Sequence, residues 1–316
     1  MKVLITGIGS RMGQLMTHLL LEAGDAVIGI DRRPVSGAPE GVALHRVDIR
    51  KRDAEEVFRT ERPEAVVHLA TMAHLHEAAE DRHRINLWGT KAVFDWCDRY
   101  GVAQAIFVGR HTYYGAAPDT PLYHQESDPP LGLDSFPELA DLVAADLYAG
   151  SALWRLPRLK TAILRVCYTL GAAPQGTLAA YFGGRRVPTV LGFDPLFQVI
   201  HDTDAARAIV AALRKQVRGV YNVAGPPPLP LSHWIAATGR QRVPLPERLL
   251  ALSQGRFGLP RLERGAIRHL KYPVVIDASE FQRVTGFVAE HDAAAIAASF
   301  RDVRPSTPPP RWAPLE

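Results

Sequence analysis

The sequence is poor in cysteine and has no long apolar run, and each shortage excludes a class of protein. Its two cysteines, Cys97 and Cys167, lie far apart and form no CxxC motif, which excludes a disulfide framework and a cysteine-rich metal site. No apolar run approaches the roughly 18 residues of a membrane-spanning helix, and the run that begins at Lys2 leaves no room for a signal peptide. We therefore expect a soluble, cytoplasmic protein.

Charge of one sign is not concentrated anywhere in the chain. The formal net charge of +4 and the pI near 9.1 come from dispersed arginines, without the block of like charges that a nucleic-acid surface or a membrane arm would show. The 47% hydrophobic and 22% charged residues are ordinary for a globular protein of 316 residues. We expect no nucleic-acid partner and no membrane partner.

Short β-branched or apolar runs alternate with helical patterns, which predicts a parallel sheet covered by helices. Between the first two runs, apolar residues from Met12 to Ala23 follow helical spacing, and Gly24 stands where the helix should end. The predicted fold class is α/β, with a doubly wound parallel sheet of the Rossmann type. The predicted strands are residues 3–6, 26–30, 42–47, 65–69, 105–108, 161–166 and 220–223.

The composition changes after Gly171 and again after Ala224, where glycine, proline and aromatic residues become frequent. This change predicts a smaller lobe over the carboxyl edge of the sheet, and a proline-rich end that is extended or disordered. The expected parts are a dinucleotide-binding Rossmann domain (residues 1–171, completed by 196–224), a C-terminal substrate lobe (172–195 and 225–303) and a proline-rich tail (304–316).

The segment ITGIGSRMG, residues 5–13, lies at the turn between the first predicted strand and the first predicted helix. Backbone N–H groups and the helix dipole at such a turn can hold a pyrophosphate. Asp31 ends the second predicted strand, where a carboxylate can accept hydrogen bonds from ribose hydroxyls; the alternative is a tight glycine turn with an ordinary surface Asp. We predict NAD as cofactor, because Asp31 would repel a 2′-phosphate, while Arg11, Arg32 and Arg33 leave NADP open.

These motifs resemble an extended short-chain dehydrogenase/reductase of the NAD-dependent epimerase/dehydratase family. The family's TGxxGxxG is present as TGIGSRMG, in which Ser10 replaces the middle glycine and puts a side chain where backbone usually approaches the pyrophosphate. Further landmarks of the family are VDIR, HLAT, NLWGTK and ILRVCYTLG. The resemblance implies cofactor contacts from Gly7, Gly9, Ser10, Arg11, Met12, Gly13, Asp31, Arg32, Asp48, Ile49, Leu69, Ala70, Thr71, Asn86 and Val108.

The segments GFDP and FQVIHDTDAARA also resemble a bacterial UDP-glucose 4-epimerase subgroup that can lack the catalytic tyrosine. In the family, a Ser or Thr after the fifth strand and a Tyr-x-x-x-Lys on the next helix carry the chemistry. The resemblance puts Arg110 at the serine, with Thr112 two residues later. On the next predicted helix it puts Glu138 at the tyrosine, Leu142 at the lysine and Asp146 at a trailing acidic position. The usual pair is absent, because no tyrosine in the chain has a lysine four residues on.

The substituted residues suggest a different polar site. We hypothesise that Arg110 binds an anionic or carbonyl oxygen of the ligand while Glu138 handles a proton, and that the two form an ion pair if they face each other. The alternatives are a salt bridge without a catalytic role, or two side chains that point to solvent. His111 and Tyr113 are further acid or base candidates, against the alternative of a satisfied loop histidine, and Tyr114 is expected to fill the core.

Histidines and glutamates after the fourth predicted strand have a spacing that suggests metal ligands, but no second cluster completes a site. We expect no metal, and interpret these residues as a polar rim near the ligand cleft. They are His74, His76, Glu77, Glu80 and His83.

Two predicted helices carry more apolar residues than one sheet face needs. By resemblance, these helices form the four-helix interface of a homodimer; the alternative is packing onto the sheet of one protomer. The residues are Leu87, Val93, Phe94, Trp96, Leu139, Leu142, Val143 and Leu147.

Three classes of function stay open. The first is an NAD-dependent enzyme, epimerase/dehydratase-like or oxidoreductase, on a small-molecule substrate such as a nucleotide sugar or another polyhydroxy compound. The second is an NAD(H)-binding sensor or scaffold without turnover, and the third is a non-redox lyase, isomerase or cyclase that reuses the cleft. We favour an enzyme, since a sensor has little need for the polar residues of the catalytic loop.

Overall fold

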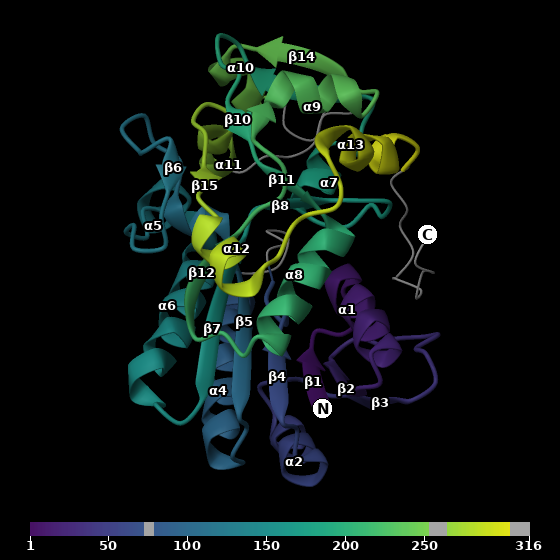
Figure 1. Cartoon of the computed structure of the whole chain (residues 1–316). Helices are drawn as coiled ribbons and strands as arrows, with labels where there is room; N and C mark the ends of the chain where they lie inside the picture. Colours follow the sequence, from purple (N-terminus) through teal and green to yellow (C-terminus); the bar gives the residue numbers. More distant parts are fainter. Residues whose placement is uncertain (73–78, 253–263, 304–316) are drawn as a thin grey trace.

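The computed structural model describes residues 1–72, 79–252 and 264–303. A sheet of seven strands forms its centre, in the order β12-β7-β5-β4-β1-β2-β3 (Figure 1), and every neighbouring pair is parallel. The order of the strands reverses between β1 and β4, as in a doubly wound Rossmann sheet, so the predicted fold class is confirmed. The strands are β1 (Lys2–Thr6), β2 (Ala26–Asp31), β3 (Val42–Arg46), β4 (Ala65–His68), β5 (Gln104–Arg110), β7 (Lys160–Val166) and β12 (Gly219–Val223).

Helices cover both faces of the sheet because its strands are apolar on both sides. Val3 and Ile5 of β1 belong to one hydrophobic cluster and Leu4 belongs to the other, since successive side chains of a strand point to opposite faces. The first cluster includes residues of α1 (Arg11–Glu22) and α8 (Asp202–Arg214). The second includes residues of α2 (Arg52–Glu61), α4 (Thr90–Arg99) and α6 (Ala140–Arg155).

Beyond β7 the chain leaves the sheet and builds a second group of elements at the carboxyl ends of the strands (Figure 1). These elements have a hydrophobic cluster of their own, in which Phe182 and Trp234 are fully buried. Its strands are β8 (Tyr168–Leu170) with β11 (Val199–His201), β9 (Arg186–Val190) with β14 (Gln241–Leu245), and β10 (Leu196–Phe197) with β13 (Leu229–Pro230). Its helices are α7 (Thr177–Tyr181), α9 (Leu231–Ala237), α10 (Glu247–Leu252), α11 (Arg264–His269) and α13 (Ala293–Arg301), while α12 (Ser279–Thr285) returns to the sheet beside β12.

Short elements connect the sheet to the region of the predicted catalytic residues. Glu138 does not lie on the α-helix that the sequence predicted around it, but on a 3-10 turn that precedes α6. These connections are α3 (Ala79–His83), the π-helical turn η1 (Arg84–Gly89), the 3-10 turns η2 (His111–Tyr114) and η3 (Pro137–Leu139), α5 (Gly132–Ser135), and β6 (Tyr123–His124) with β15 (Val275–Ile276). Within the described ranges, none of the helices combines the length and the apolar character that crossing a bilayer requires. The proline-rich tail lies outside the described residues.

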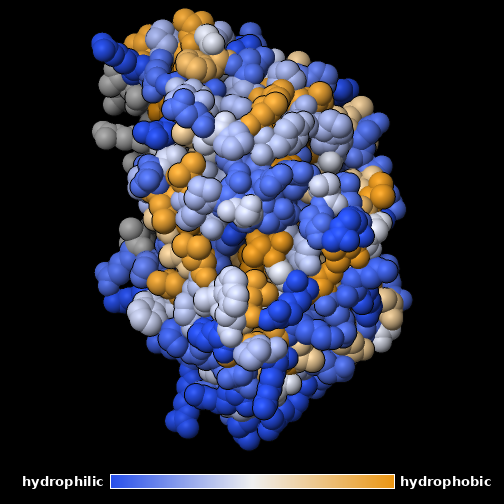
Figure 2. Space-filling view, turned by 60° about the vertical axis from the view of Figure 1, so that its left-hand side comes forward, coloured by the Kyte–Doolittle hydropathy of each residue, from blue (hydrophilic) through white to orange (hydrophobic). Residues whose placement is uncertain are grey.

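Most of the apolar residues predicted at a dimer interface lie inside the protomer instead. Val93, Phe94 and Trp96 belong to one of the two clusters on the sheet and Val143 belongs to the other. Leu139 and Leu142 pack instead with Phe136 and Ala266 in a small separate cluster. The dimer interface itself stays a prediction. Leu147 is 44% exposed, and two tryptophans outside the prediction, Trp88 and Trp154, are 54% and 79% exposed. The side of the molecule that Figure 2 brings forward shows separate apolar patches among polar ones. The buried residues are Val93, Phe94, Trp96, Leu139, Leu142 and Val143.

Candidate active site

The loop between β1 and α1 brings three backbone segments into close contact. Gly7 has a φ of +76°, which favours glycine, and a Cβ there would stand 3.0 Å from the backbone nitrogen of Ala70. A Cβ on Gly13 would stand 2.6 Å from the carbonyl oxygen of Ile8. Glycine is required at both positions, and the loop has the tight packing of a dinucleotide-binding turn.

Ser10, at the family's middle glycine, caps the N-terminus of α1. Its hydroxyl donates to the carbonyl oxygen of Gly7 over 2.8 Å and accepts the N–H of Gly13 over 3.1 Å. The hydroxyl is therefore used within the loop. The serine stabilises the start of α1, and its contact with a pyrophosphate stays a prediction.

Asp31 lies at the end of β2 with 6% of its surface exposed. Its Oδ2 atom accepts the N–H of Gly9 and its Oδ1 atom accepts the N–H of Arg33, each over 3.0 Å. A carboxylate offers about four acceptor positions, so about two remain for ribose hydroxyls. The acceptor positions that Asp31 keeps at this edge therefore fit the ribose hydroxyls of an adenine dinucleotide.

The arginines that left NADP open differ in their surroundings. The Arg11 Nε atom donates to Asp202 over 3.0 Å, and the Arg33 Nε atom lies 3.6 Å from Asp31. Arg32 is exposed. Because Arg11 and Arg33 already face carboxylates, the site favours NAD over a cofactor with a 2′-phosphate.

Asp48 and Ile49, which were both predicted as cofactor contacts, lie between β3 and α2. The Arg50 Nη2 atom donates to Asp48 over 2.6 Å, and this hydrogen bond lowers the pKa of the carboxyl group. Ile49 is buried, and its Cδ1 atom would lie 2.5 Å from a Cβ placed on Gly89. The cofactor contacts of Asp48 and Ile49 both stay predictions.

Asn86, in η1, fixes the segment that follows β4. Its Oδ1 atom accepts the N–H of Met72 over 2.7 Å, and its Nδ2 atom donates to the Met72 carbonyl oxygen over 2.9 Å. The same Nδ2 atom donates to Asp141 over 2.8 Å. Asn86 therefore holds the backbone in place beside the site. The predicted contact residues Leu69, Ala70 and Thr71 lie immediately before the fixed residue.

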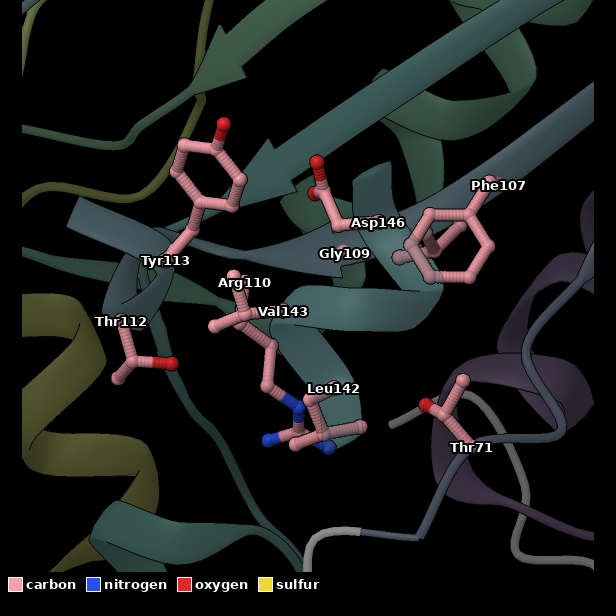
Figure 3. A pocket seen from close by; sticks show the side chains of 10 residues that line it. Thr71, Phe107, Gly109, Arg110, Thr112, Tyr113, Leu142, Val143 and Asp146 are labelled. Carbon is pink, nitrogen blue, oxygen red and sulfur yellow. The ribbon is translucent and has the colours of Figure 1, made fainter. Parts of the chain in front are cut away.

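A small cavity lies at the carboxyl end of β5, between that strand and α6 (Figure 3). Its volume is about 10 Å³, enough for one water molecule. The structure brings together here five predicted residues, whereas His111 and Glu138 are not part of the lining. The five are Thr71, Val108, Arg110, Thr112 and Tyr113. The lining residues are Thr71, Phe107, Val108, Gly109, Arg110, Thr112, Tyr113, Leu142, Val143 and Asp146.

Arg110 is the last residue of β5, and its guanidinium is the cation in the lining of this cavity. Among the described residues, its guanidinium has no hydrogen bond and no ion pair, and desolvation lowers its pKa. Figure 3 shows the guanidinium turned toward Leu142, the position that the family resemblance assigns to lysine. Arg110, which stands at the family's serine position, thus extends its side chain toward Leu142, which stands at the family's lysine position.

The ion pair predicted between Arg110 and Glu138 is not formed in the described structure, so that expectation is wrong. Within the described ranges, the buried Oε2 atom of Glu138 has no hydrogen-bond partner, while its backbone oxygen accepts from Arg82 over 2.6 Å. The physical reason is the 3-10 turn that holds Glu138, because its backbone is tied to Arg82 and its side chain lies outside the cavity lining.

His111 was predicted as an acid or base, and its surroundings favour the alternative of a structural histidine. It is 2% exposed, its Nδ1 atom lies 3.2 Å from the carbonyl oxygen of Val166, and it is absent from the cavity lining. Burial lowers its pKa to about 3, so the imidazole is neutral at physiological pH. Its ring stands edge-on to Tyr168, with centroids 4.2 Å apart.

The two tyrosines of η2 have different surroundings. Tyr113 lines the cavity beneath the Arg165 guanidinium, whose Cζ atom is 3.4 Å from the ring centroid, and burial raises the pKa of its phenol. Tyr114 is fully buried and donates to Asn222 over 2.7 Å, as expected for a residue that fills the core. Thr112 shares the cavity with Tyr113.

A buried ion pair closes one side of the cavity. The Arg165 Nη2 atom donates to the Asp146 Oδ1 atom over 2.8 Å, and both side chains are about 5% exposed or less. Asp146 packs against Gly109, where a Cβ would stand 2.6 Å from its Oδ2 atom. Asp146, at the trailing acidic position of the resemblance, thus contacts Arg165 of the landmark segment ILRVCYTLG.

Sequence reasoning missed Tyr168 and His269. The Tyr168 hydroxyl lies 3.4 Å from the Nδ1 atom of His269, and the charge of Arg110 acts on the Tyr168 phenol. The signal for Tyr168 was its place in the landmark ILRVCYTLG, whereas nothing local marks His269, which is 101 residues away.

The predicted polar rim is only partly within the described residues. His74, His76 and Glu77 lie outside them, while Glu80 and His83 belong to α3. In the described part of the chain, no three His, Cys, Asp or Glu side chains are grouped closely enough to hold a metal ion.

The fold and site place this chain in a known family. The profile of the NAD dependent epimerase/dehydratase family matches residues 3–224, which include the glycine loop and the cavity. The chain belongs to this family. The family predicted from the motifs is therefore confirmed, and with it NAD as the family's cofactor.

The individual relatives and solved structures described next are each less than 30% identical to this chain. An uncharacterized protein of Mycobacterium tuberculosis is 27% identical over 303 residues, covering 90% of this chain and 79% of that protein. The UDP-glucose 4-epimerase of Homo sapiens is 28% identical over 258 residues, covering 68% and 73%. The solved structure of MoeE5 with UDP-glucuronic acid and NAD has a TM-score of 0.76 at 20% identity, with 95% of this chain and 97% of MoeE5 covered. At that identity, the structural likeness shows the shared fold.

Proposed function

We propose that this protein is an epimerase- or dehydratase-type enzyme that binds NAD at the loop between β1 and α1 and acts on a nucleotide sugar with Arg110 as its active-site cation. The observation that carries the proposal is the partly buried Arg110 guanidinium, which lines the cavity without a hydrogen bond or a counter-ion among the described residues. The human UDP-glucose 4-epimerase and the UDP-sugar complex of MoeE5 support the substrate class.

The NAD site of the proposal consists of the glycine loop, Asp31 and the segment held by Asn86. When bound, NAD supplies a hydride acceptor. This chain's own contribution is to hold the adenosine ribose at Asp31 and the pyrophosphate at the N-terminus of α1.

Arg110 takes the place of two family residues in this proposal. A guanidinium can donate to a ligand oxygen and stabilise negative charge that develops on it, most effectively where water is scarce. The cavity of about 10 Å³ leaves room for about one water molecule at this end of β5. Leu142 cannot supply the charge of the family's lysine, so Arg110 is the cation that remains there.

Glu138 gains less support from the geometry. Its buried Oε2 atom without a described partner is compatible with a proton-transfer role, but the cavity lining does not include it. We therefore assign the ligand contact to Arg110 and give Glu138 no defined step.

The test is calorimetry with NAD, followed by UDP-glucose and dTDP-glucose added to the NAD-saturated protein. Binding of NAD and of one sugar nucleotide, with a change in the absorbance of reduced nicotinamide, is expected. Arg110→Ala should slow the change in nicotinamide absorbance with these neutral sugars by about tenfold or more, because the charge that develops in the reaction is no longer stabilised, and the exposed Arg158→Ala is the control. NAD binding without any sugar-nucleotide effect would instead favour a sensor without turnover.

We further propose a cytoplasmic homodimer. The exposed Trp88, Leu147 and Trp154 form apolar surface on η1 and α6, beyond what the protomer buries. Both cysteines are free and buried, which suits a reducing compartment. Cell fractionation tests the compartment, and light scattering tests the oligomeric state.

A further inference from the structure

The carboxylates nearest the carboxyl end of β5 do not neutralise Arg110. Asp146 is bound by one buried cation and Asp141 accepts a hydrogen bond from an amide, while Glu138 makes no ion pair with Arg110. Desolvation lowers the pKa of the Arg110 guanidinium, and no ion pair offsets this effect within the described ranges. The guanidinium is thus a partly buried cation that has no anionic partner among residues 1–72, 79–252 and 264–303.

An unpaired charge with little access to water is unfavourable, and it becomes favourable when a bound group supplies the opposite charge. The place of Arg110 limits which part of a ligand can do so. Its guanidinium lies at the end of β5 beside Leu142, in the cavity where the family's reaction residues stand, and not at the N-terminus of α1 where a pyrophosphate binds. The missing negative charge therefore belongs to the reacting part of the substrate, which is the sugar.

Tyr168 contacts His111, the residue that follows Arg110, with ring centroids 4.2 Å apart. Burial raises the pKa of Tyr168, so its hydroxyl stays protonated and can donate a hydrogen bond. Its ring is held by stacking on Phe197, with centroids 5.1 Å apart, and by the edge of His111. Burial lowers the pKa of His111 to about 3 and that of His269 to about 4, so neither imidazole is a competing cation.

A planar guanidinium matches the geometry of a carboxylate, to which it can donate two parallel hydrogen bonds. We infer that the substrate is a nucleoside-diphosphate-linked sugar acid, whose sugar carboxylate is bound by Arg110 with the Tyr168 hydroxyl as a neutral donor. This inference rests on the proposed function, because it names the substrate class of the same site.

The experiment compares two probes that differ in one group. UDP-glucuronate and UDP-glucose are titrated by calorimetry into the NAD-saturated protein. The wild type should bind UDP-glucuronate about tenfold or more tightly than UDP-glucose, as expected for a charge-assisted hydrogen bond. Arg110→Ala should remove this preference and leave the affinity for UDP-glucose nearly unchanged. Arg110→Lys should keep part of the preference, and Tyr168→Phe should reduce it several-fold.

Arg158→Ala, at an exposed arginine, is the matched control and should keep the full preference. Melting temperatures and NAD affinities show whether each variant is folded. Equal affinity of the wild type for both probes overturns the inference and leaves the proposed function standing. The inference is also overturned if Arg110→Ala lowers the affinities for UDP-glucuronate and UDP-glucose equally, because the guanidinium would then bind a group that both probes contain. The proposed function would still stand. Binding of NAD with neither probe bound overturns both proposals.

Discussion

The backbone N–H of Gly9 donates to the Oδ2 atom of Asp31 over 3.0 Å, so the glycine loop and the end of β2 form one unit. The carboxylate that should bind the ribose is therefore positioned by the loop that should bind the pyrophosphate. A change at Asp31 is expected to affect the loop as well as the ribose contact.

Asp31→Asn should lower NAD affinity by about tenfold to a hundredfold, because hydrogen bonds to a charged group contribute about 1.5–3 kcal/mol. The discrimination between NAD and NADP should fall as well, since the repulsion of a 2′-phosphate is removed. Calorimetry with both cofactors measures the two effects, and Asp98→Asn at an exposed site is the control. An unchanged NAD affinity would contradict the cofactor assignment of Asp31.

Gly13→Ala should destabilise the protein by about 1–3 kcal/mol, because the added methyl group overlaps the backbone of Ile8 at the β1–α1 turn. Gly150→Ala is the matched control: it lies inside α6 with nothing within 4 Å of the added methyl group. That change should stabilise the helix by up to about 1 kcal/mol. Urea unfolding of the two variants should therefore give shifts of opposite sign. Shifts of the same sign would show that the backbone at Gly13 accepts a methyl group without loss of stability, or that the methyl group at Gly150 is not accommodated.

Arg165→Met should destabilise the protein by about 3–5 kcal/mol, because it leaves the Asp146 carboxylate buried without its partner. The double variant Arg165→Met/Asp146→Leu should lose less stability than the sum of the single changes, since no charge is then left buried. A double-mutant cycle in urea measures the coupling. Additive losses would mean that the buried pair contributes no coupling energy.

Stability should fall as the pH is lowered below about 6.5. Burial lowers the pKa of His68 and His111 to about 3 and that of His269 to about 4, from an ordinary 6.5. Each group is neutral in the folded protein but takes a proton in the unfolded chain. Its contribution is complete above pH 6.5 and is lost as the pH falls toward the folded value, at up to about 1.4 kcal/mol per pH unit for each group.

Urea unfolding at a series of pH values measures this slope. His111→Gln should lower the slope of the unfolding free energy against pH by up to about 1.4 kcal/mol per pH unit, which is the contribution of one proton. His233→Gln, at an exposed histidine, should leave it unchanged. A slope that His111→Gln does not alter would show that His111 is not buried in its neutral form.

If the protein forms the proposed homodimer through α6, Trp154→Arg should shift it toward monomer by placing a charge at the exposed tryptophan of that helix, while changing the protomer's stability by about 0.5 kcal/mol or less. Light scattering over a concentration series measures the shift. Leu249→Arg, at a 53% exposed site outside α6, is the control. If both variants stay dimeric, the interface lies elsewhere.

The sequence by itself determined the sheet, the glycine loop and the loss of the usual catalytic pair. These features depend on short-range periodicity and on backbone requirements that a few neighbouring residues satisfy. Gly24, for example, ends the first helix with a φ of +78°, a conformation for which glycine is preferred. The end of β2 similarly brings Asp31 to the edge where the glycine loop begins.

Only the tertiary structure decided which side chains share the active-site cavity. The sequence paired Arg110 with Glu138, but the turn before α6 keeps Glu138 out of the lining. His111 is buried, and its Nδ1 atom lies 3.2 Å from the carbonyl oxygen of Val166 at the end of β7. Tyr168 and His269 meet across 101 residues of chain. Side-chain directions and contacts of this kind depend on how distant elements pack, which no local pattern encodes.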